Sequence, residues 1–464
     1  MNYKSIMNNQ HILRRTIILA VPIMIQSAVT NAVSLVDHIM VGSLGTESMT
    51  AVSIVGQLLF VFALAIFGGT SGSGIYAAQF YGQGNTEGVR AATRMKIWVC
   101  LFCTLAGTAL LLFADSFFIN LYLHGQSAEI DALLTLDKAK EYLHIMLLGL
   151  PAMAVTQIYA SSLRETGESV KPMAAGIVSV AADIILNWLL IYGSLGFPKM
   201  GVAGAAVATV IARYIEAVVL VAWSYLRRKK HPFIIGLWRT LLIPRELCRT
   251  MLVKTIPIFL NEFLWAAGIA ALTQCYSIRG LEVVAGINIS NALCNLLNVV
   301  FVALGHAVGI LIGHTLGAGA FERAKKESFT LTWFTAVICL GLTAILIMLS
   351  GVFPNVYDTT DEVRDLATDF IIVTALFFPV QGILNTLYFT LRSGGKTLVT
   401  FIFDSVFSWT VTMPLALALC FLTDMNIIAV YAIVQAADII KIIIGAVMIK
   451  KGIWVSNLTE EFTA

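Results

Sequence analysis

Twelve long apolar stretches recur along the 464-residue chain, most of them about 20 to 28 residues in length. At 1.5 Å per helical residue, each stretch can cross a hydrocarbon core of about 30 Å. The stretches are continuous rather than alternating, so we expect helices and exclude a barrel of short strands with a two-residue pattern. The composition agrees, because 58% hydrophobic and 12% charged residues depart from the roughly half and quarter of a soluble domain. The stretches lie near residues 16–41, 50–80, 93–120, 139–163, 171–193, 200–226, 250–277, 282–316, 327–350, 366–391, 397–421 and 425–449.

The loops between these stretches differ in charge. Lys and Arg gather in alternate loops, with about 23 basic residues on one side and about five on the other. The opposite side holds mainly acidic sequences at 45–49, 127–138 and 358–365. Because cytoplasmic loops carry the basic excess, we expect a multi-pass protein of the inner (plasma) membrane with both termini cytoplasmic. The net charge of +3 therefore describes topology and gives no indication of nucleic acid binding.

The chain also contains an internal repeat, which appears when the sequence is shifted by about 230 residues. Each half holds six apolar stretches, so the halves share one orientation and should be related by an axis along the membrane normal, with a central cleft. We predict an amino-terminal six-helix lobe over 1–226, a basic cytoplasmic linker over 227–249 and a carboxy-terminal six-helix lobe over 250–464. The matched residues are Pro22 and Pro257, Gly45 and Gly280, "GIYAAQFYGQGN" (74–85) and "GILIGHTLGAGA" (309–320), Pro151 and Pro379, "LRETG" (163–167) and "LRSGG" (391–395), and Arg213/Glu216 and Asp438/Lys441 with reversed signs.

Four polar residues fall in the outer half of the amino-terminal lobe. A charge at the centre of a membrane helix costs on the order of 3 kcal/mol and usually marks a pathway. Counting along the helices places Asp37, Asp183, Asn187 and Thr209 at similar depth, with Asp183 and Asn187 on one helix face. Two carboxylates, an amide and a hydroxyl suit a proton or a hard cation such as sodium. A hydrogen-bonded network that only holds helices together stays open as the alternative. We expect no basic residue at the depth of Asp37, with Arg213 nearer the cytoplasm.

The carboxy-terminal lobe carries acidic residues in its inner half. Glu262 and Asp404 each lie about 12 Å beyond a cytoplasmic lysine. Either could bind a cationic substrate or a coupling ion, or could be structural, and Asn261 beside Glu262 belongs to the same candidate site. The i,i+3 pairs Arg213/Glu216 and Asp438/Lys441 are expected to satisfy themselves and to be structural.

Enzymatic motifs are lacking in the sequence. "SGGKT" (393–397) resembles the end of a phosphate-binding loop, but Thr390 occupies the position of its first glycine and a membrane helix precedes it instead of a strand. The apolar stretches hold no nucleophile and base set and no metal-ligand cluster. We therefore expect no enzymatic activity and no cofactor.

At these residues the sequence resembles the multidrug and toxic compound extrusion (MATE) transporters. The resemblance covers nearly the whole chain, through "VPIMIQSAVTNAVSLVDHIMVGSLG", "AAQFYGQGN", "LRETGESVKPM", "GVAGAAVAT" and "LRSGGKT". It implies two six-helix lobes around a central cleft and export of amphipathic, often cationic compounds driven by inward movement of sodium or protons.

The same resemblance implies roles for single residues. Asp37 matches the first-helix aspartate of the family, and Thr209 matches a threonine that helps to bind the cation in one prokaryotic branch. That branch has Asn before Asp in its fifth helix, whereas this chain has Asp183 before Asn187. Glu262 matches an acidic residue of the seventh helix, but Gln381 stands where members with a carboxy-terminal ion site have an aspartate.

We therefore predict a secondary antiporter, embedded in the lipid bilayer, that exports small-molecule organic cations by alternating access. Sodium or protons are the coupling ion, and the sequence leaves both open. We expect a monomer with no obligate protein partner. A flippase or exporter of a lipid-linked or polar metabolite on a related fold is the alternative.

Overall fold

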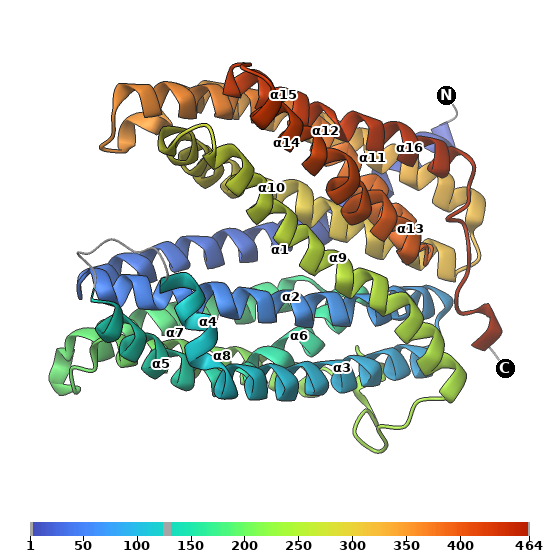
Figure 1. Cartoon of the computed structure of the whole chain (residues 1–464). Coiled ribbons are helices and arrows are strands. Elements are labelled where there is room, and N and C mark those ends of the chain that lie inside the picture. The colour runs from blue at the N-terminus through green and yellow to red at the C-terminus, as the bar shows by residue number, and fades with distance from the viewer. Residues whose placement is uncertain (1–2, 124–130, 463–464) are drawn as a thin grey trace. The chain divides into compact units, whose positions relative to one another are not determined.

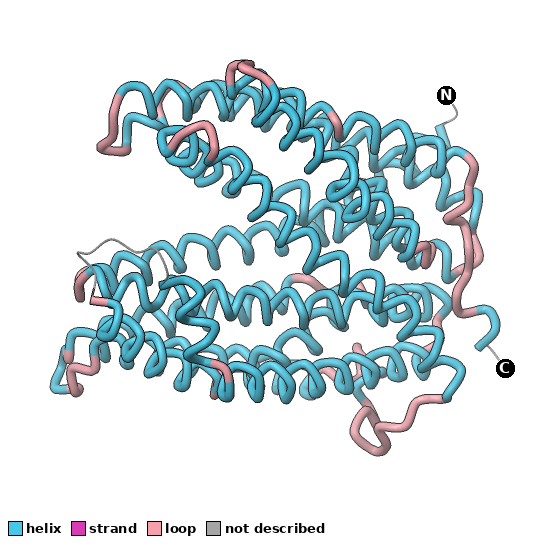
Figure 2. Tube along the Cα trace, in the orientation of Figure 1, coloured by secondary structure: helices cyan, strands magenta, loops and turns pink. Residues whose placement is uncertain are grey.

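The computed structural model describes residues 3–123 and 131–462, and all regular structure within these ranges is helical (Figures 1 and 2). Residues 127–130 of the acidic loop, and residues 1–2 and 463–464 of the two expected lobes, lie outside the described ranges. The α-helices are α1 (Tyr3–Gly42), α2 (Thr46–Gln83), α3 (Thr86–Phe113), α4 (Asp115–Leu123), α5 (Ala132–Leu147), α6 (Leu150–Glu165), α7 (Val170–Tyr192), α8 (Gly201–Leu226), α9 (Arg245–Ser277), α10 (Leu281–Gly317), α11 (Phe321–Ser350), α12 (Asp361–Ser393), α13 (Thr397–Phe401), α14 (Met413–Leu422), α15 (Ile427–Ala436) and α16 (Asp438–Lys450). The 3₁₀ turns are η1 (Ser194–Gly196), η2 (Pro232–Ile234), η3 (Phe353–Val356) and η6 (Glu460–Phe462), and η4 (Ile402–Val406) and η5 (Ser408–Thr412) are π-helical.

Among the described residues, eleven helical segments are long and apolar enough to cross a membrane. The pair α5 and α6 brings the number to twelve when it is counted as one span. In hydrocarbon every backbone N–H and C=O group needs an internal partner, and a helix provides one within the segment. The polytopic all-helical fold expected from the apolar stretches is confirmed.

The fourth span is bent and is not the single straight helix suggested by residues 139–163. Its two parts, α5 and α6, meet at 46°. Gly149 precedes α6 and Pro151 lies in its first turn. Proline lacks the N–H group that would continue the ladder of α5, and its ring excludes the preceding carbonyl from a helical contact. The break is therefore a local consequence of the sequence.

The chain forms two compact units, each of them discontinuous in sequence. One unit comprises Met1–Met24, Ala78–Asn85 and Leu252–Ala464, and the other comprises Ile25–Ala77 and Thr86–Met251. The expected lobes at 1–226 and 250–464 remain a prediction about the repeat. The units differ from it because the first part of α1 and the last turns of α2 pack with the carboxy-terminal half.

The backbone carries the signature of the repeat. Gly84 and Gly319 have positive φ angles of 80° and 72°, and Gly167 and Gly395 have positive φ angles of 87° and 73°. These glycines hold matched positions of the two halves and each ends a long helix. A residue with a side chain is strained in this conformation, so both halves use glycine to make the same turns.

The expected linker over 227–249 is anchored to α3. Arg90 Nε donates to the carbonyl of Phe233 at 3.2 Å and Arg94 Nε to that of Leu237 at 3.3 Å. One helical turn further, Trp98 Nε1 donates to the carbonyl of Leu241 at 3.0 Å. The linker backbone thus finds partners on one face of α3, and helix α9 begins only at Arg245.

A buried ion pair joins α3 to α6. The side chain of Lys96 is fully buried and pairs with Glu165. Lys96 Nζ also donates to Ser161 Oγ at 2.9 Å and to Ser162 Oγ at 3.2 Å. A Cβ atom at Gly74 would overlap the Glu165 carboxylate. Helix α2 therefore approaches this ion pair closely because residue 74 has no side chain.

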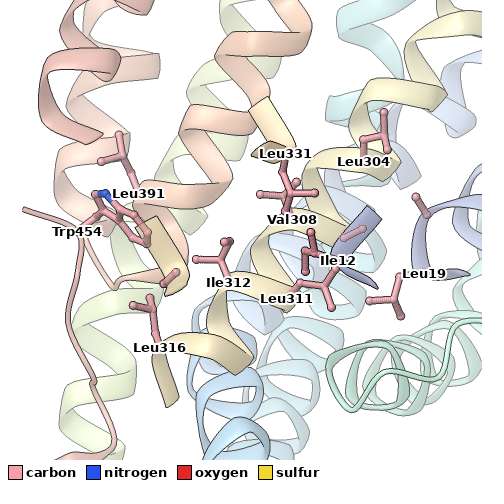
Figure 3. Packing of buried hydrophobic residues seen from close by; sticks show 13 residues of the cluster. Ile12, Leu19, Leu304, Val308, Leu311, Ile312, Leu316, Leu331, Leu391 and Trp454 are labelled. Carbon is pink, nitrogen blue, oxygen red and sulfur yellow. The ribbon is translucent and has the colours of Figure 1, made fainter. Parts of the chain in front are cut away.

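The unit that comprises Met1–Met24, Ala78–Asn85 and Leu252–Ala464 contains a core built from residues near both ends of the chain. Ile12 and Leu19 of α1 pack with Leu304 and Val308 of α10, and Trp454 of the carboxy-terminal segment lies beside Leu391 (Figure 3).

The side chain of Gln79 fixes this carboxy-terminal segment. Its Nε2 donates to the carbonyl of Ser393 at 2.8 Å and to that of Ser456 at 3.3 Å, and its Oε1 accepts from the N–H of Leu458 at 2.7 Å. The end of α2 thereby holds the segment that follows α16.

Candidate functional site

Helices α1, α7 and α8 bring the four predicted polar residues of the amino-terminal half together. Asn187 Nδ2 donates to Asp37 Oδ1 at 2.8 Å. The carboxyl group of Asp183 interacts with that of Asp37 and with the hydroxyl group of Thr209. Asp183 and Asn187 lie one turn apart on the buried face of α7. The structure thus places Asp37, Asp183, Asn187 and Thr209 in one cluster.

Two oxygen atoms of this cluster have no hydrogen-bond donor among the residues that the structure describes. Asp183 Oδ1 and Asn187 Oδ1 are buried and unpartnered. A buried polar atom without a partner costs about 1–3 kcal/mol, and more when it is charged. Carboxylate, amide and hydroxyl oxygens are ligands that hard cations prefer. The arrangement can therefore accept a proton or a small cation.

No group of three or more His, Cys, Asp or Glu residues that could hold a metal occurs among the described residues. The amino-terminal cluster has two carboxylates, so a cation bound there would also need the amide and hydroxyl oxygens.

Arg213 is a basic neighbour of this cluster. It interacts electrostatically with Asp183, and it lies one helical turn beyond Thr209 on α8. That Arg213 lies nearer the cytoplasm than Asp37 stays a prediction. Its charge reaches the cluster because a residue count gives axial position only, and the long arginine side chain extends over more than one turn. Glu216 interacts with both Arg213 and Arg164.

The carboxy-terminal candidates form a second cluster, centred on Asn261. Its Nδ2 donates to Asp404 Oδ2 at 3.0 Å and to Tyr388 Oη at 3.3 Å. Ser405 Oγ donates to Asn261 Oδ1 at 2.6 Å. Glu262 and Asp404 interact electrostatically. Helices α9 and α12 and the π-helical segment η4 therefore supply one polar cluster.

Arg392 is the basic partner of Glu262, and the sequence assigned it to a loop instead. It occupies the last turn of α12, is 5% exposed and lies 4.0 Å from Glu262 Oε1. Its guanidinium group also lies 5.8 Å from the ring centroid of Tyr388 and 5.5 Å from that of Phe389. The repeat gave a signal for Arg392, because Arg164 is the matching residue in the other half. Arg164 also has a side-chain partner in the structure, since its Nη2 donates to Gln26 Oε1 at 2.6 Å.

Gln381 bonds to Asp438 of α16. Its Nε2 donates to Asp438 Oδ2 at 2.6 Å. Lys441 Nζ lies 3.1 Å from Asp438 Oδ1 and 3.7 Å from Asp404 Oδ1. The expected i,i+3 pair of Asp438 and Lys441 exists, but it is not self-contained, because the lysine connects it to Asp404.

The segment that carries Asp404 is π-helical at η4 and η5. Wide π turns are rare and occur frequently at functional sites. In this segment Ser408 Oγ donates to the carbonyl of Asp404 at 2.9 Å, and Lys441 Nζ donates to Ser408 Oγ at 3.2 Å. Asp404 and Ser408 therefore both contact Lys441 of α16.

An all-helical fold with eleven or twelve apolar segments long enough to cross a membrane, among the described residues, is that of a multi-pass membrane protein. The MatE family model matches residues 22–189 and again residues 257–418, one match in each half. The chain belongs to this family, the MATE multidrug efflux transporters, whose members are transporters and not enzymes and need no cofactor.

Relatives match over most of the chain. A probable multidrug resistance protein YoeA of Bacillus subtilis is 28% identical over 428 residues, which cover 91% of this chain and 90% of that protein. A probable multidrug resistance protein NorM of Thermotoga maritima is 24% identical, covering 91% and 88%. A multidrug resistance MATE family transporter of the MOP superfamily, solved in an outward-facing conformation, superimposes with a TM-score of 0.81 at 19% identity, covering 95% of this chain and 97% of that one. This last likeness concerns the fold.

Proposed function

We propose that this transporter is a secondary active antiporter that exports amphipathic, cationic organic compounds in exchange for sodium or protons by alternating access. The observation that carries the proposal is the amino-terminal cluster, where two carboxylates lie together with two buried, unpartnered oxygens. Such a cluster is costly unless a cation or proton binds in it. The multidrug resistance names of the relatives support drug-like substrates.

In this proposal Asp37, Asp183, Asn187 and Thr209 bind the coupling ion. Asp37 and Asp183 supply charge, while Asn187 orients Asp37 through its 2.8 Å hydrogen bond. Sodium would use oxygens from all four side chains, whereas a proton would be shared by the two carboxylates. Arg213 limits the negative charge of the cluster, which favours a monovalent ion.

Glu262, Asn261, Asp404 and Gln381 belong to the proposed substrate or second ion site. Glu262 and Asp404 attract a cation, and Asn261 orients Asp404 at 3.0 Å. Gln381 acts on this site indirectly, because it bonds to Asp438, and Asp438 pairs with the lysine that contacts Asp404, Lys441.

The membrane arrangement is part of the proposal. We infer that both termini are cytoplasmic in the inner (plasma) membrane, because the basic residues concentrate in alternate loops. An even number of spans returns the chain to its starting side, in agreement with this orientation. We expect the transporter to act as a monomer, with the two halves as its moving lobes.

The test is transport in proteoliposomes, with a sodium gradient and a pH gradient imposed separately and no ATP. Uptake of a fluorescent organic cation should follow one gradient and stop when an ionophore collapses it. Asp37→Asn should insert normally and lose coupled transport. Asp131→Asn is the matched control, because Asp131 caps α5 in an exposed position and asparagine caps helices equally well.

Two results would contradict the proposal. Transport that continues after both gradients are collapsed would exclude ion-driven antiport. An Asp37→Asn variant with the rate and ion dependence of the unchanged protein would make the cluster a packing network. Movement of a lipid-linked or polar metabolite without ion coupling would favour a flippase.

A further inference from the structure

Lys441 borders the carboxy-terminal cluster beside Asp404, and the proposed transport roles give it no direct part in ligand binding. Its side chain is 5% exposed. The ammonium group lies 3.1 Å from Asp438, 3.2 Å from Ser408 Oγ and 5.3 Å from the ring centroid of Phe407. The carboxylate of Asp404 is the most distant of its polar partners, at 3.7 Å. The lysine is therefore held mainly by groups other than Asp404.

The charges of this cluster do not cancel. By formal charge the acidic residues Glu262, Asp404 and Asp438 outnumber the basic residues Arg392 and Lys441 by one. The two longest ion-pair distances are those to Glu262, 4.0 Å from Arg392, and to Asp404, 3.7 Å from Lys441. These two carboxylates also interact with each other. The excess charge therefore belongs to the carboxylates that the bases engage most loosely.

We propose that Lys441 is a tethered cation that competes with the transported cation for Asp404 and so sets the affinity and selectivity of the carboxy-terminal site. The inference rests on the proposed function, because it takes Glu262 and Asp404 as the site for a cationic ligand. A monovalent organic cation binds between these carboxylates after the lysine gives up its 3.7 Å contact with Asp404. Asp438 and Ser408 retain the ammonium group, so the lysine stays paired when the ligand is bound.

The chemistry of lysine suits this exchange. Its ammonium group is a compact point charge on a flexible stem, whereas arginine would fix two carboxylate oxygens with a rigid fork. Asp404 keeps its orientation meanwhile, because Asn261 holds its other oxygen at 3.0 Å. The site thus excludes weakly attracted neutral compounds and releases bound cations readily, as an exporter requires.

The experiment is a double-mutant cycle read by equilibrium binding of tetraphenylphosphonium to the purified full-length protein in detergent. Lys441→Met should tighten binding on the order of tenfold, since it removes a nearby like charge. Lys441→Arg keeps the charge and should leave affinity low. The gain from Lys441→Met should disappear in an Asp404→Asn background, because coupled residues give non-additive effects.

A second variant guards against misfolding caused by the unpaired Asp438. Lys441→Met combined with Asp438→Asn removes the base together with its main partner, and it should bind the probe more tightly than Asp438→Asn alone. Chromatographic homogeneity and the melting temperature are recorded for every variant.

The outcomes separate the two claims. Tightening that depends on Asp404 supports the inference. The inference is overturned if Lys441→Met does not tighten binding, either alone or together with Asp438→Asn. It is also overturned if Lys441→Met gives an equal gain with and without Asp404→Asn. If Asp404→Asn has no effect in any background while Asp37→Asn still abolishes coupling, the carboxy-terminal ligand site fails together with the inference, and the antiport mechanism stands.

Discussion

Removing one partner of the buried Lys96–Glu165 pair should destabilise the protein strongly. In Glu165→Gln the ammonium group of Lys96 keeps only neutral partners, including Ser161 at 2.9 Å and Ser162 at 3.2 Å. Lys96 has no exposed surface from which water could replace the lost carboxylate. Breaking a buried ion pair in this way costs about 3–5 kcal/mol, and we expect that loss in the free energy of unfolding.

The assay is denaturant unfolding in mixed micelles, followed by tryptophan fluorescence. Glu322→Gln is the control, because the Lys325–Glu322 pair has the same chemistry and is exposed, and its unfolding midpoint should not change. A double variant, Lys96→Met with Glu165→Met, should recover most of the stability, since apolar side chains can replace a buried pair. The reasoning is refuted if Glu165→Gln and Glu322→Gln shift the midpoint equally, or if the double variant is as unstable as the single one.

Two further predictions concern packing and pH. Gly317→Ala places a methyl group against the backbone of Gln79 and should lower the free energy of unfolding by about 1–3 kcal/mol in the same assay. In the control, Gly341→Ala, the added methyl group meets open space, so stability should not change. Equal effects of the two variants would contradict the close packing of Gly317 against Gln79. Burial, with Lys230 nearby, lowers the pKa of His231 in the linker below its usual 6.5, so the unfolded chain binds a proton first and stability should fall as the pH drops below about 6.5. Unfolding midpoints measured across this pH range should depend less steeply on pH in His231→Gln. An equally steep pH dependence in that variant would show that His231 does not cause the loss of stability.

The sequence predicted the helices well because lipid leaves the backbone few options. Continuous apolar stretches and matched glycines are local signals, and the helices and turns follow them closely. The bend between α5 and α6 could also have been predicted from Gly149 and Pro151. The packing of residues 78–85 in the same unit as Leu252–Ala464 could not have been predicted, since it depends on tertiary contacts.

The clusters were predicted in unequal measure. Depth counting correctly grouped Asp37 with Asp183, because both lie well inside long spans, although their role in coupling stays a prediction. The apolar stretch 366–391 ended one residue before Arg392, whose side chain is nevertheless buried near Glu262. The contact of Lys441 with Asp404 was not predicted, because the i,i+3 pair of Asp438 and Lys441 looks complete in one dimension.

The anchoring of Gln79 has a consequence for biosynthesis. The residues that it holds, Ser393, Ser456 and Leu458, are made long after α2 has left the ribosome. During translation the end of α2 must therefore remain without its final partners until almost the entire polypeptide is complete. A nascent chain stalled a few residues short of Ser456 would already contain all the membrane helices of the described residues, and it would still lack the bonds from Gln79 to Ser456 and Leu458.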